Sequence, residues 1–359
     1  MRGYTMKEKR ILFTGGGTAG HVMVNLALIP YFQEQGWKVD YIGSKNGIEK
    51  DLIKDLPDVT YYSVATGKLR RYMSIENFKD PFKVMKGTWE AWRIIGKIKP
   101  NVIFSKGGFV SVPVVAAAKL RRVPSLIHES DMTPGLANKL AIPFAKKVLA
   151  TFPETTKHLP EKKAVHVGAV IREALFTGNK EHGMKMIDNK SDKKVLLIMG
   201  GSIGSQKINE AIRNNLTTLL KEFHIVHICG KGNVDNTVQQ DGYVQFEYVN
   251  EGLKDIFAST DFVISRAGAN AIFEFLALNI PMLLIPLSRA ASRGDQIDNA
   301  QSFNKQGYAN MLEEEQLDHL LDEITKLVKE APIIRDKMKE YKSRESRKMV
   351  IQLIEEMAK

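Results

Sequence analysis

Short apolar runs alternate along this chain with longer segments in which apolar positions recur every three or four residues. The short runs predict buried strands, and the longer segments predict helices that pack through one side. Predicted strands of the first half cover residues 9–14, 37–43, 60–64, 101–105, 124–128 and 147–151. Predicted strands of the second half cover residues 194–199, 224–229, 243–246, 261–265 and 281–286. This alternation favours the α/β class, with parallel sheets and crossover helices.

The helices of the second half are predicted over residues 206–220, 253–259, 270–278 and 295–306. At 359 residues the chain is long enough for two domains with separate cores. The stretch 168–189 is rich in Gly, Asn and charged residues, which is typical of a linker. We therefore predict two Rossmann-like domains, over residues 1–168 and 169–340, followed by a helical C-terminal segment.

Each half opens with a strand that leads into a glycine-rich turn. Gly15, Gly16 and Gly17 follow the first strand, and Gly200 and Gly201 follow the strand at 194–199. Glycines let the backbone approach a phosphate, and the N-terminus of the next helix attracts negative charge. Two such turns predict two nucleotide-type folds facing one cleft. The second strand lacks the closing acidic residue of the dinucleotide fingerprint, which disfavours a nicotinamide dehydrogenase.

Charge is divided unequally between the halves. The chain has a formal net charge of +11, yet residues 1–168 hold 27 Lys and Arg against 14 Asp and Glu, whereas residues 169–359 hold 25 against 27. The first half therefore carries all of the excess and predicts an anionic partner there. A single cysteine, Cys229, excludes an internal disulfide and is compatible with the cytoplasm. The longest apolar run, 280–287, is far shorter than the ~20 residues of a spanning helix.

A third glycine turn carries the sharpest chemical signal. Gly268 follows the strand at 261–265, and a helix is predicted to start near Asn270. The N–H groups of residues 269–271 would then face a diphosphate, and Glu274, one turn further on, would reach ribose hydroxyls. His21 stands at the helix start after the first turn, where a histidine can act as a general base beside a bound anion. No His, Cys or Asp cluster has metal-ligand spacing, so we expect no metal and no cofactor.

Six motifs, in order over nearly the whole chain, resemble those of the MurG family of glycosyltransferases, which add N-acetylglucosamine to the lipid-linked peptidoglycan precursor. They are residues 13–21 (FTGGGTAGH), 106–113 (KGGFVSVP), 128–131 (HESD), 135–138 (GLAN), 199–202 (MGGS) and 265–274 (SRAGANAIFE). The resemblance implies the GT-B fold, with the acceptor on the first Rossmann-like domain and the UDP-sugar on the second. It also implies that the last helix, 341–359, returns to the first domain.

The resemblance further implies an inverting hexosyltransferase. N-acetylglucosamine would move from UDP-N-acetylglucosamine to the 4-hydroxyl of undecaprenyl-diphosphate-N-acetylmuramoyl-pentapeptide, in peptidoglycan synthesis. The sequence leaves two candidates for the base that takes the hydroxyl proton, His21 first and Glu129 second. Three positions depart from the commoner pattern, which has Gly at 19, Asn at 131 and Gln at 295, where this chain has Ala19, Asp131 and Asp295.

Substrate contacts carried over by position fall into two groups. One group comprises Thr18, expected with His21 in the acceptor-side loop near the reacting sugar, and the further substrate-binding residues Gly16, Gly17, Asp131 and Asn138. The resemblance leaves open whether Asp131 and Asp295 contact the donor. Those expected to hold the donor nucleotide-sugar are Arg172 and Ser202, Val249 through its backbone to uracil, Ala269, Asn270 and Ala271 to the diphosphate, Glu274 to ribose, and Gln296 to the sugar hydroxyls.

The basic segment 68–99 predicts a docking face for a membrane. It holds nine Lys and Arg and three Asp and Glu, and Phe82, Met85, Trp89 and Trp92 recur at helical spacing. A basic amphipathic helix with tryptophans is typical of an anionic membrane interface, although the same stripe could form the core face of a crossover helix. We expect peripheral binding at the cytoplasmic face of the cell membrane, where cell-wall synthesis and division proteins are further partners. The residues expected to face the membrane are Arg70, Arg71, Met73, Ile75, Phe82 and Trp89.

Other functions share part of this pattern. Another GT-B enzyme, such as a UDP-N-acetylglucosamine 2-epimerase or a different lipid-linked glycosyltransferase, would keep the glycine turns, but an epimerase needs no lipid-facing surface. A non-catalytic nucleotide-sugar-binding protein would bind the donor without releasing UDP. Binding of nucleic acid would explain the charge of the first half and leave the turns of the second half without a role, so we expect no nucleic-acid partner.

Overall fold

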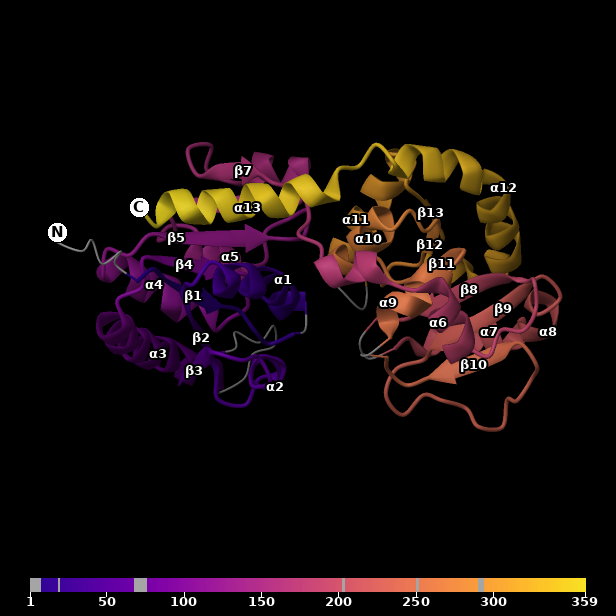
Figure 1. Cartoon of the computed structure of the whole chain (residues 1–359), viewed down its shortest axis with the longest axis horizontal. Coiled ribbons are helices and arrows are strands. Elements are labelled where there is room, and N and C mark those ends of the chain that lie inside the picture. The colour runs from indigo at the N-terminus through magenta and orange to yellow at the C-terminus, as the bar shows by residue number, and fades with distance from the viewer. Residues whose placement is uncertain (1–7, 19, 68–75, 202–203, 250–251, 290–293) are drawn as a thin grey trace, which may run out of the picture. The chain divides into compact units, whose positions relative to one another are not determined.

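The computed structural model describes residues 8–18, 20–67, 76–201, 204–249, 252–289 and 294–359. The chain divides into two compact units, which are described separately (Figure 1). Unit 1 comprises Met1–Arg172 and Ser343–Lys359, and unit 2 comprises Glu173–Lys342. Each unit is a parallel α/β fold, as the alternation of strands and helices predicted.

Unit 1 is built on a seven-stranded parallel sheet in the order β3-β2-β1-β4-β5-β6-β7. The strands are β1 (Arg10–Thr14), β2 (Lys38–Ser44), β3 (Val59–Val64), β4 (Val102–Ser105), β5 (Ser125–Glu129), β6 (Lys147–Ala150) and β7 (Ala164–His166). Its helices are α1 (Gly20–Glu34), α2 (Ile48–Ile53), α3 (Glu76–Ile98), α4 (Ser111–Leu120), α5 (Leu136–Ala141), the 3-10 helix η1 (Pro153–His158) and α13 (Ser343–Met357).

Alternation along β1 explains the two layers of helices in unit 1. Ile11 and Phe13 point to one face of the sheet and pack in a core with α1 and α13. Leu12 points to the other face and packs in a core with α3 and α4. Successive side chains of a strand point to opposite faces, so a continuous apolar run requires a sheet covered on both sides.

Unit 2 repeats the plan with six parallel strands in the order β10-β9-β8-β11-β12-β13. The strands are β8 (Lys194–Met199), β9 (Phe223–Ile228), β10 (Tyr243–Phe246), β11 (Phe262–Ser265), β12 (Met282–Leu284) and β13 (Ala309–Met311). Its helices are α6 (Lys180–Met186), α7 (Gln206–Asn214), α8 (Leu216–Leu219), α9 (Leu253–Ser259), α10 (Ala269–Ala277), α11 (Asp295–Lys305), α12 (Leu320–Met338), and the 3-10 helices η2 (Glu173–Thr177) and η3 (Glu314–His319).

The structure differs from the predicted elements in three respects. The stretch 168–189, predicted as a linker, contains η2 and α6, and from Glu173 onward it belongs to unit 2. The strands β7 and β13 were not predicted, because each is a three-residue edge strand that is too short to show a pattern. The helix predicted over 206–220 is divided at Asn215, whose φ of −105° and ψ of 7° lie outside the helical region.

Strand order reverses at one point in each sheet, and this places the glycine turns. In unit 1, β1 pairs with β4, so that Thr14 lies beside Ser105 at the carboxyl ends of the strands. In unit 2, β8 pairs with β11, so that Met199 lies beside Ser265. Loops that leave such a switch point diverge and form the usual ligand site of an open α/β sheet.

The C-terminal helix α13 belongs to unit 1, although it follows unit 2 in the chain. Val350 and Ile354 are fully buried in the core that includes α1. The hydroxyl of Tyr31 donates to Glu355 at 3.1 Å, and Nε of Arg347 donates to the carbonyl of Ala27 at 3.2 Å. Figure 1 shows α13, in yellow, lying along the indigo and magenta elements of unit 1.

Candidate active site

The first glycine loop of unit 1 is held by hydrogen bonds to neighbouring segments. The N–H of Gly16 donates to the carbonyl of Gly107 at 3.3 Å, which joins the loops after β1 and β4. The N–H of Gly17 donates to Oε2 of Glu49 at 3.1 Å. Both amides therefore already have acceptors in this conformation, and neither offers its hydrogen to a phosphate as the turn pattern suggested.

His21 is oriented by the same loop. Its Nδ1 lies 3.0 Å from the carbonyl oxygen of Gly16 and 3.1 Å from Oγ1 of Thr18. A carbonyl oxygen can only accept, so Nδ1 carries the hydrogen and the lone pair of the neutral ring is on Nε2. A neutral imidazole in this tautomer has the form that a general base requires.

Glu49 is a site residue that the sequence did not reveal. It lies at the start of α2 and is fully buried. Its Oε1 accepts the N–H of Ser44 at 2.8 Å and the hydroxyl of Ser44 at 2.6 Å, while Oε2 accepts from Gly17. A glutamate in a short polar helix is typical of a solvated surface, so only the sheet topology identifies this carboxylate as part of the loop.

Glu129 holds the turn that follows β5. Its Oε1 accepts the N–H of Asp131 at 3.0 Å, and its Oε2 accepts the N–H of Gly135 at 2.9 Å and the side-chain amide of Asn138 at 2.8 Å. Three donors thus occupy both carboxylate oxygens. The structure therefore brings together three predicted residues, Glu129, Asp131 and Asn138. The carboxylate of Glu129 accepts a hydrogen bond from each of the other two.

A buried cation lies beneath these loops. Lys106 follows β4, is 1% exposed, and donates from Nζ to the hydroxyl of Ser130 at 2.8 Å. Burial lowers the pKa of Lys106, while the charges of Glu129 and Asp131 act in the opposite direction. Burial, and then the charge of Lys106, lowers the pKa of His128 well below its ordinary value, so His128 stays neutral.

In unit 2, the turn after β11 leads directly into α10. Gly268 is the N-cap of this helix and has extended backbone angles and no side-chain cap. The first amides of a helix have no intrahelical acceptor, so those of residues 269–271 form an end that favours an anion. Nδ2 of Asn299 in α11 donates to the carbonyl of Ala267 at 3.0 Å and fixes the turn. Glu274 is half-buried one turn further along α10.

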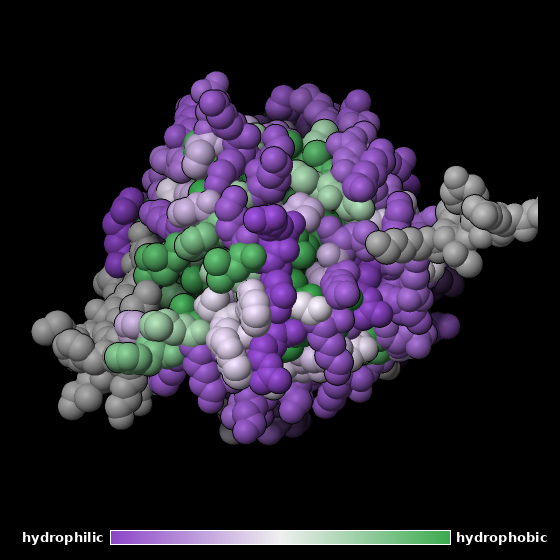
Figure 2. All heavy atoms as spheres, turned by 90° about the vertical axis from the view of Figure 1, so that its left-hand side faces the viewer, coloured by the Kyte–Doolittle hydropathy of each residue, from purple (hydrophilic) through white to green (hydrophobic). Residues whose placement is uncertain are grey.

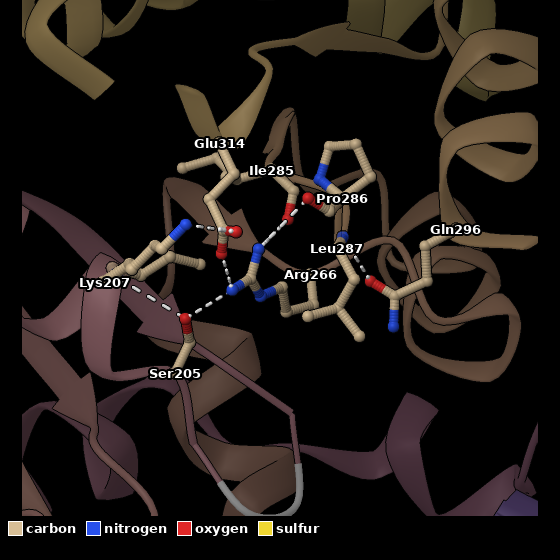
Figure 3. A network of polar contacts seen from close by, with 9 residues as sticks. Ser205, Lys207, Arg266, Ile285, Pro286, Leu287, Gln296 and Glu314 are labelled. Carbon is tan, nitrogen blue, oxygen red and sulfur yellow. Dashed lines mark hydrogen bonds and ion pairs between the residues drawn. The ribbon is translucent and has the colours of Figure 1, made fainter. Parts of the chain in front are cut away.

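A buried ion pair joins the loops around this end of unit 2 (Figure 3). Nη1 of Arg266 donates to the carbonyls of residues 285 and 286, each at 3.1 Å. Nη2 donates to Oγ of Ser205 at 2.7 Å and to Glu314, which also accepts from Lys207 at 3.0 Å. Burial acts to raise the pKa of Glu314, but the hydrogen bonds and charges of Arg266 and Lys207 outweigh it and lower the pKa.

The network extends to Gln296 of α11. The N–H of Leu287 donates to Oε1 of Gln296 at 3.1 Å (Figure 3). Because the carbonyl side of the amide faces the backbone, the NH₂ side is directed away from it. Gln296 is therefore held as a donor, in the orientation that suits an oxygen of a sugar hydroxyl.

The remaining predicted residues lie as follows. Val249 is buried just after β10, and Arg172 is the last residue of the first part of unit 1. Ser202 and the predicted membrane-facing residues Arg70, Arg71, Met73 and Ile75 lie outside the described residues. Where the structure describes the chain, no group of three or more His, Cys, Asp and Glu side chains could hold a metal ion.

Comparison with known proteins defines the family. The model of the glycosyltransferase family 28 N-terminal domain matches residues 11–150, and that of the C-terminal domain matches residues 195–354. The chain is 69% identical to a UDP-N-acetylglucosamine–N-acetylmuramyl-(pentapeptide) pyrophosphoryl-undecaprenol N-acetylglucosamine transferase of Oceanobacillus iheyensis, over 98% of this chain and 99% of the relative. It is 64% identical to the transferase of that name from Geobacillus thermodenitrificans, over 86% and 87%.

A solved structure agrees with these relatives. The crystal structure of Acinetobacter baumannii MurG superposes with a TM-score of 0.76 at 25% identity, covering 97% of this chain and 99% of that chain. A kitacinnamycin glycosyltransferase, at 16% identity and a TM-score of 0.73 over 98% and 100% of the two chains, shares the fold. The GT-B fold implied by the motifs is confirmed, and the chain belongs to glycosyltransferase family 28 and, within it, to the MurG family of N-acetylglucosamine transferases.

Proposed function

We propose that this enzyme transfers N-acetylglucosamine from UDP-N-acetylglucosamine to the 4-hydroxyl of undecaprenyl-diphosphate-N-acetylmuramoyl-pentapeptide, with inversion at the anomeric carbon. The observation that carries the proposal is 69% identity, over nearly the full length of both chains, to a transferase named for these substrates. The two switch points, each with its own set of polar side chains, supply a place for a donor and for an acceptor.

Unit 2 takes the donor in this proposal. The first amides of α10, at residues 269–271, hold the diphosphate, and Glu274 accepts hydrogen bonds from the ribose. Val249 contacts uracil through its backbone, Gln296 donates to a sugar hydroxyl, and Ser202 completes the nucleotide site of this unit. Negative charge grows on the diphosphate as the glycosidic bond breaks, so amides fixed in advance favour the transition state.

Unit 1 supplies the base and the acceptor loops. The acceptor oxygen attacks the anomeric carbon while Nε2 of His21 takes its proton, and UDP departs with the electrons of the broken bond. The Nδ1–H tautomer of His21 supports this role. The three donors around Glu129 favour His21 over Glu129, because protonation would cost Glu129 those hydrogen bonds. Glu129 instead holds the turn with Asp131 and Asn138, beside the Gly16–Thr18 loop.

The outer face of α3 supports peripheral membrane binding. Phe82, Met85 and Trp89 are 73%, 69% and 56% exposed, so this stripe is a surface patch and the buried side of the helix is formed by Ala91 and Ile95. Large apolar side chains at such exposure, set in a hydrophilic surface, are typical of an interaction site. Figure 2 shows apolar side chains gathered in a patch on this end of unit 1, surrounded by hydrophilic residues.

Basic side chains accompany the patch. The guanidinium of Arg93 lies 4.8 Å from the ring centre of Trp89, and that of Arg121, beside α4, lies 3.5 Å from the ring centre of Trp92. Beyond the end of α4 is a hollow of about 810 Å³ whose six charged lining residues are all basic: Lys119, Arg122, Lys146, Lys147, Lys162 and Lys163. These features support docking on anionic lipids at the cytoplasmic face of the membrane.

No helix in the described parts of the chain is both long enough and apolar enough to cross a bilayer. In this proposal the patch and the basic hollow bind the membrane peripherally, and this surface also faces any cell-wall synthesis or division protein assembled there.

The experiment is UDP release from UDP-N-acetylglucosamine, with and without the lipid-linked muramoyl acceptor. The proposal predicts release that depends on the acceptor. Conversion of UDP-N-acetylglucosamine alone to an epimer would indicate a 2-epimerase, and binding of the donor without release would indicate a non-catalytic protein.

A further inference from the structure

One peptide group of the first glycine loop joins two titratable side chains. Its carbonyl, on Gly16, lies 3.0 Å from Nδ1 of His21. Its N–H, on Gly17, lies 3.1 Å from Oε2 of Glu49. Since the carbonyl only accepts, the imidazole must donate through Nδ1–H. The hydrogen bonds therefore run in one direction, from the imidazole through the peptide group to the carboxylate.

The carboxylate of Glu49 is fitted closely to this loop. Both hydrogen bonds from Ser44 fix its orientation, at 2.6 and 2.8 Å. A Cβ added at Gly16 would lie 2.3–2.6 Å from the carboxylate atoms of Glu49, so only glycine at this position lets the carboxylate lie against the loop. Among the described residues, Glu49 forms no ion pair with a Lys or Arg.

The other titratable groups facing this chain of hydrogen bonds do not compete for its proton. Tyr41 donates to the carbonyl of Gly15 at 2.8 Å, and Tyr61 donates to that of Ser44 at 2.7 Å. Burial, with a contribution from the charge of Glu49, raises the pKa of both phenols, so both stay neutral. Asp51 of α2 adds a negative charge that also acts on Tyr61. Lys106 lies close to the loop, since a Cβ added at Gly15 would be 3.2 Å from its own Cβ, but its Nζ donates to Ser130.

We propose that Glu49 is a positioning residue for His21, acting through the peptide group between residues 16 and 17. Its carboxylate polarises that peptide group, holds the imidazole in the Nδ1–H tautomer and stabilises the imidazolium that forms when Nε2 takes a proton. Hydrogen bonds in series strengthen one another, and more so where the local dielectric is low. The inference rests on the proposed function only in giving His21 the role of base.

Nitrogen-15 spectra of histidine-labelled protein test this link without turnover. The His21 signal is assigned by its absence in His21→Gln. We expect the neutral ring of the wild-type protein to be protonated at Nδ1. We also expect Glu49→Gln to lower the pKa of His21 by about half a pH unit or more, because a buried charge only two hydrogen bonds away is removed.

Asp40→Asn is the matched control. Asp40 is another buried carboxylate of unit 1, paired with Arg10 at 3.2 Å, and it makes no hydrogen bond to the glycine loop. We expect this variant to leave the pKa of His21 in place. A pKa that is unchanged in Glu49→Gln, or that moves equally in Asp40→Asn, would overturn the proposal.

The wild-type spectrum tests the proposal even if Glu49→Gln does not fold. A neutral His21 ring protonated at Nε2 would contradict the direction of the hydrogen bonds and overturn the proposal. Full turnover by His21→Gln would refute the base role of His21 instead. That result would leave the tautomer and the dependence of its pKa on Glu49 as they were measured, so the two failures can be told apart.

Discussion

The buried ion pair of unit 2 allows a quantitative test through Glu314→Gln. The side chains of Arg266 and Glu314 are 7% and 4% exposed, so loss of the carboxylate charge leaves a guanidinium buried without its counter-charge. Breaking such a pair by removing one partner costs about 3–5 kcal/mol. The same loop network orients Gln296, and we therefore expect the affinity for UDP-N-acetylglucosamine to fall together with the stability of unit 2.

The assay exploits the distribution of tryptophan. All three tryptophans, Trp37, Trp89 and Trp92, lie in unit 1, so tryptophan fluorescence follows that unit while far-UV circular dichroism follows both. A chain with two domains need not unfold in one transition. In urea, part of the dichroism of Glu314→Gln should be lost at a lower urea concentration than in the wild type. The fluorescence change should not occur any earlier.

Lys207→Met is the matched control, because its ammonium contacts the same carboxylate at 3.0 Å from a side chain that is 60% exposed. An exposed partner contributes only ~0–1 kcal/mol. Equal midpoints for Glu314→Gln and the wild type, or equal losses in both variants, would refute the reasoning. The lowered pKa of Glu314 also predicts how the stability of unit 2 depends on pH. The ion pair with Arg266 stabilises the folded unit above pH 4.5, the ordinary pKa, and this stabilisation is lost as the pH falls below that value.

Three further variants test the proposed base, the packing of the first glycine loop and the α3 patch. His21→Ala should lower kcat by ~10²–10⁴ and leave UDP-N-acetylglucosamine affinity unchanged in calorimetry; equal losses in both would remove the base role. Gly108→Ala, at φ +82° with its Cβ 2.1 Å from a backbone oxygen of the first glycine loop, should abolish acceptor-dependent turnover, whereas Gly36→Ala, at φ +73° in open space, should retain it. Phe82→Ser should weaken co-sedimentation with anionic vesicles, and Ile333→Ser, from an equally exposed position of unit 2, should not; equal effects would argue against the α3 patch.

Much of the fold could be predicted because both sheets are parallel and buried on two sides. Strands such as β1 and β8 are then continuous apolar runs bounded by turns, which is a strong local signal. The edge strands β7 and β13 carry three residues each and give no such signal. The break at Asn215 was missed because apolar residues continue on both sides of it.

The candidate site could be predicted only in part. Glycine turns and the residues beside them are recognisable in the sequence, and the MurG motifs include His21, Glu129 and Glu274. No sequence motif includes Glu49. It reaches the loop because β1 pairs with β2, which brings Glu49 into contact with Gly17, 32 residues earlier in the chain. The occupied amides of the first loop were likewise invisible, since a glycine-rich turn looks the same whether its N–H groups face a ligand or a carboxylate.

Direct displacement at the anomeric carbon of the donor inverts that carbon, so the configuration of the product is the decisive measurement. Incubation with UDP-N-acetylglucosamine labelled with carbon-13 at the anomeric position, together with the lipid-linked acceptor, gives a product whose one-bond C–H coupling reports that configuration. We expect a β-linked N-acetylglucosamine and one UDP for each sugar transferred. An α-linked product, or label recovered in an altered sugar nucleotide without acceptor, would contradict direct displacement.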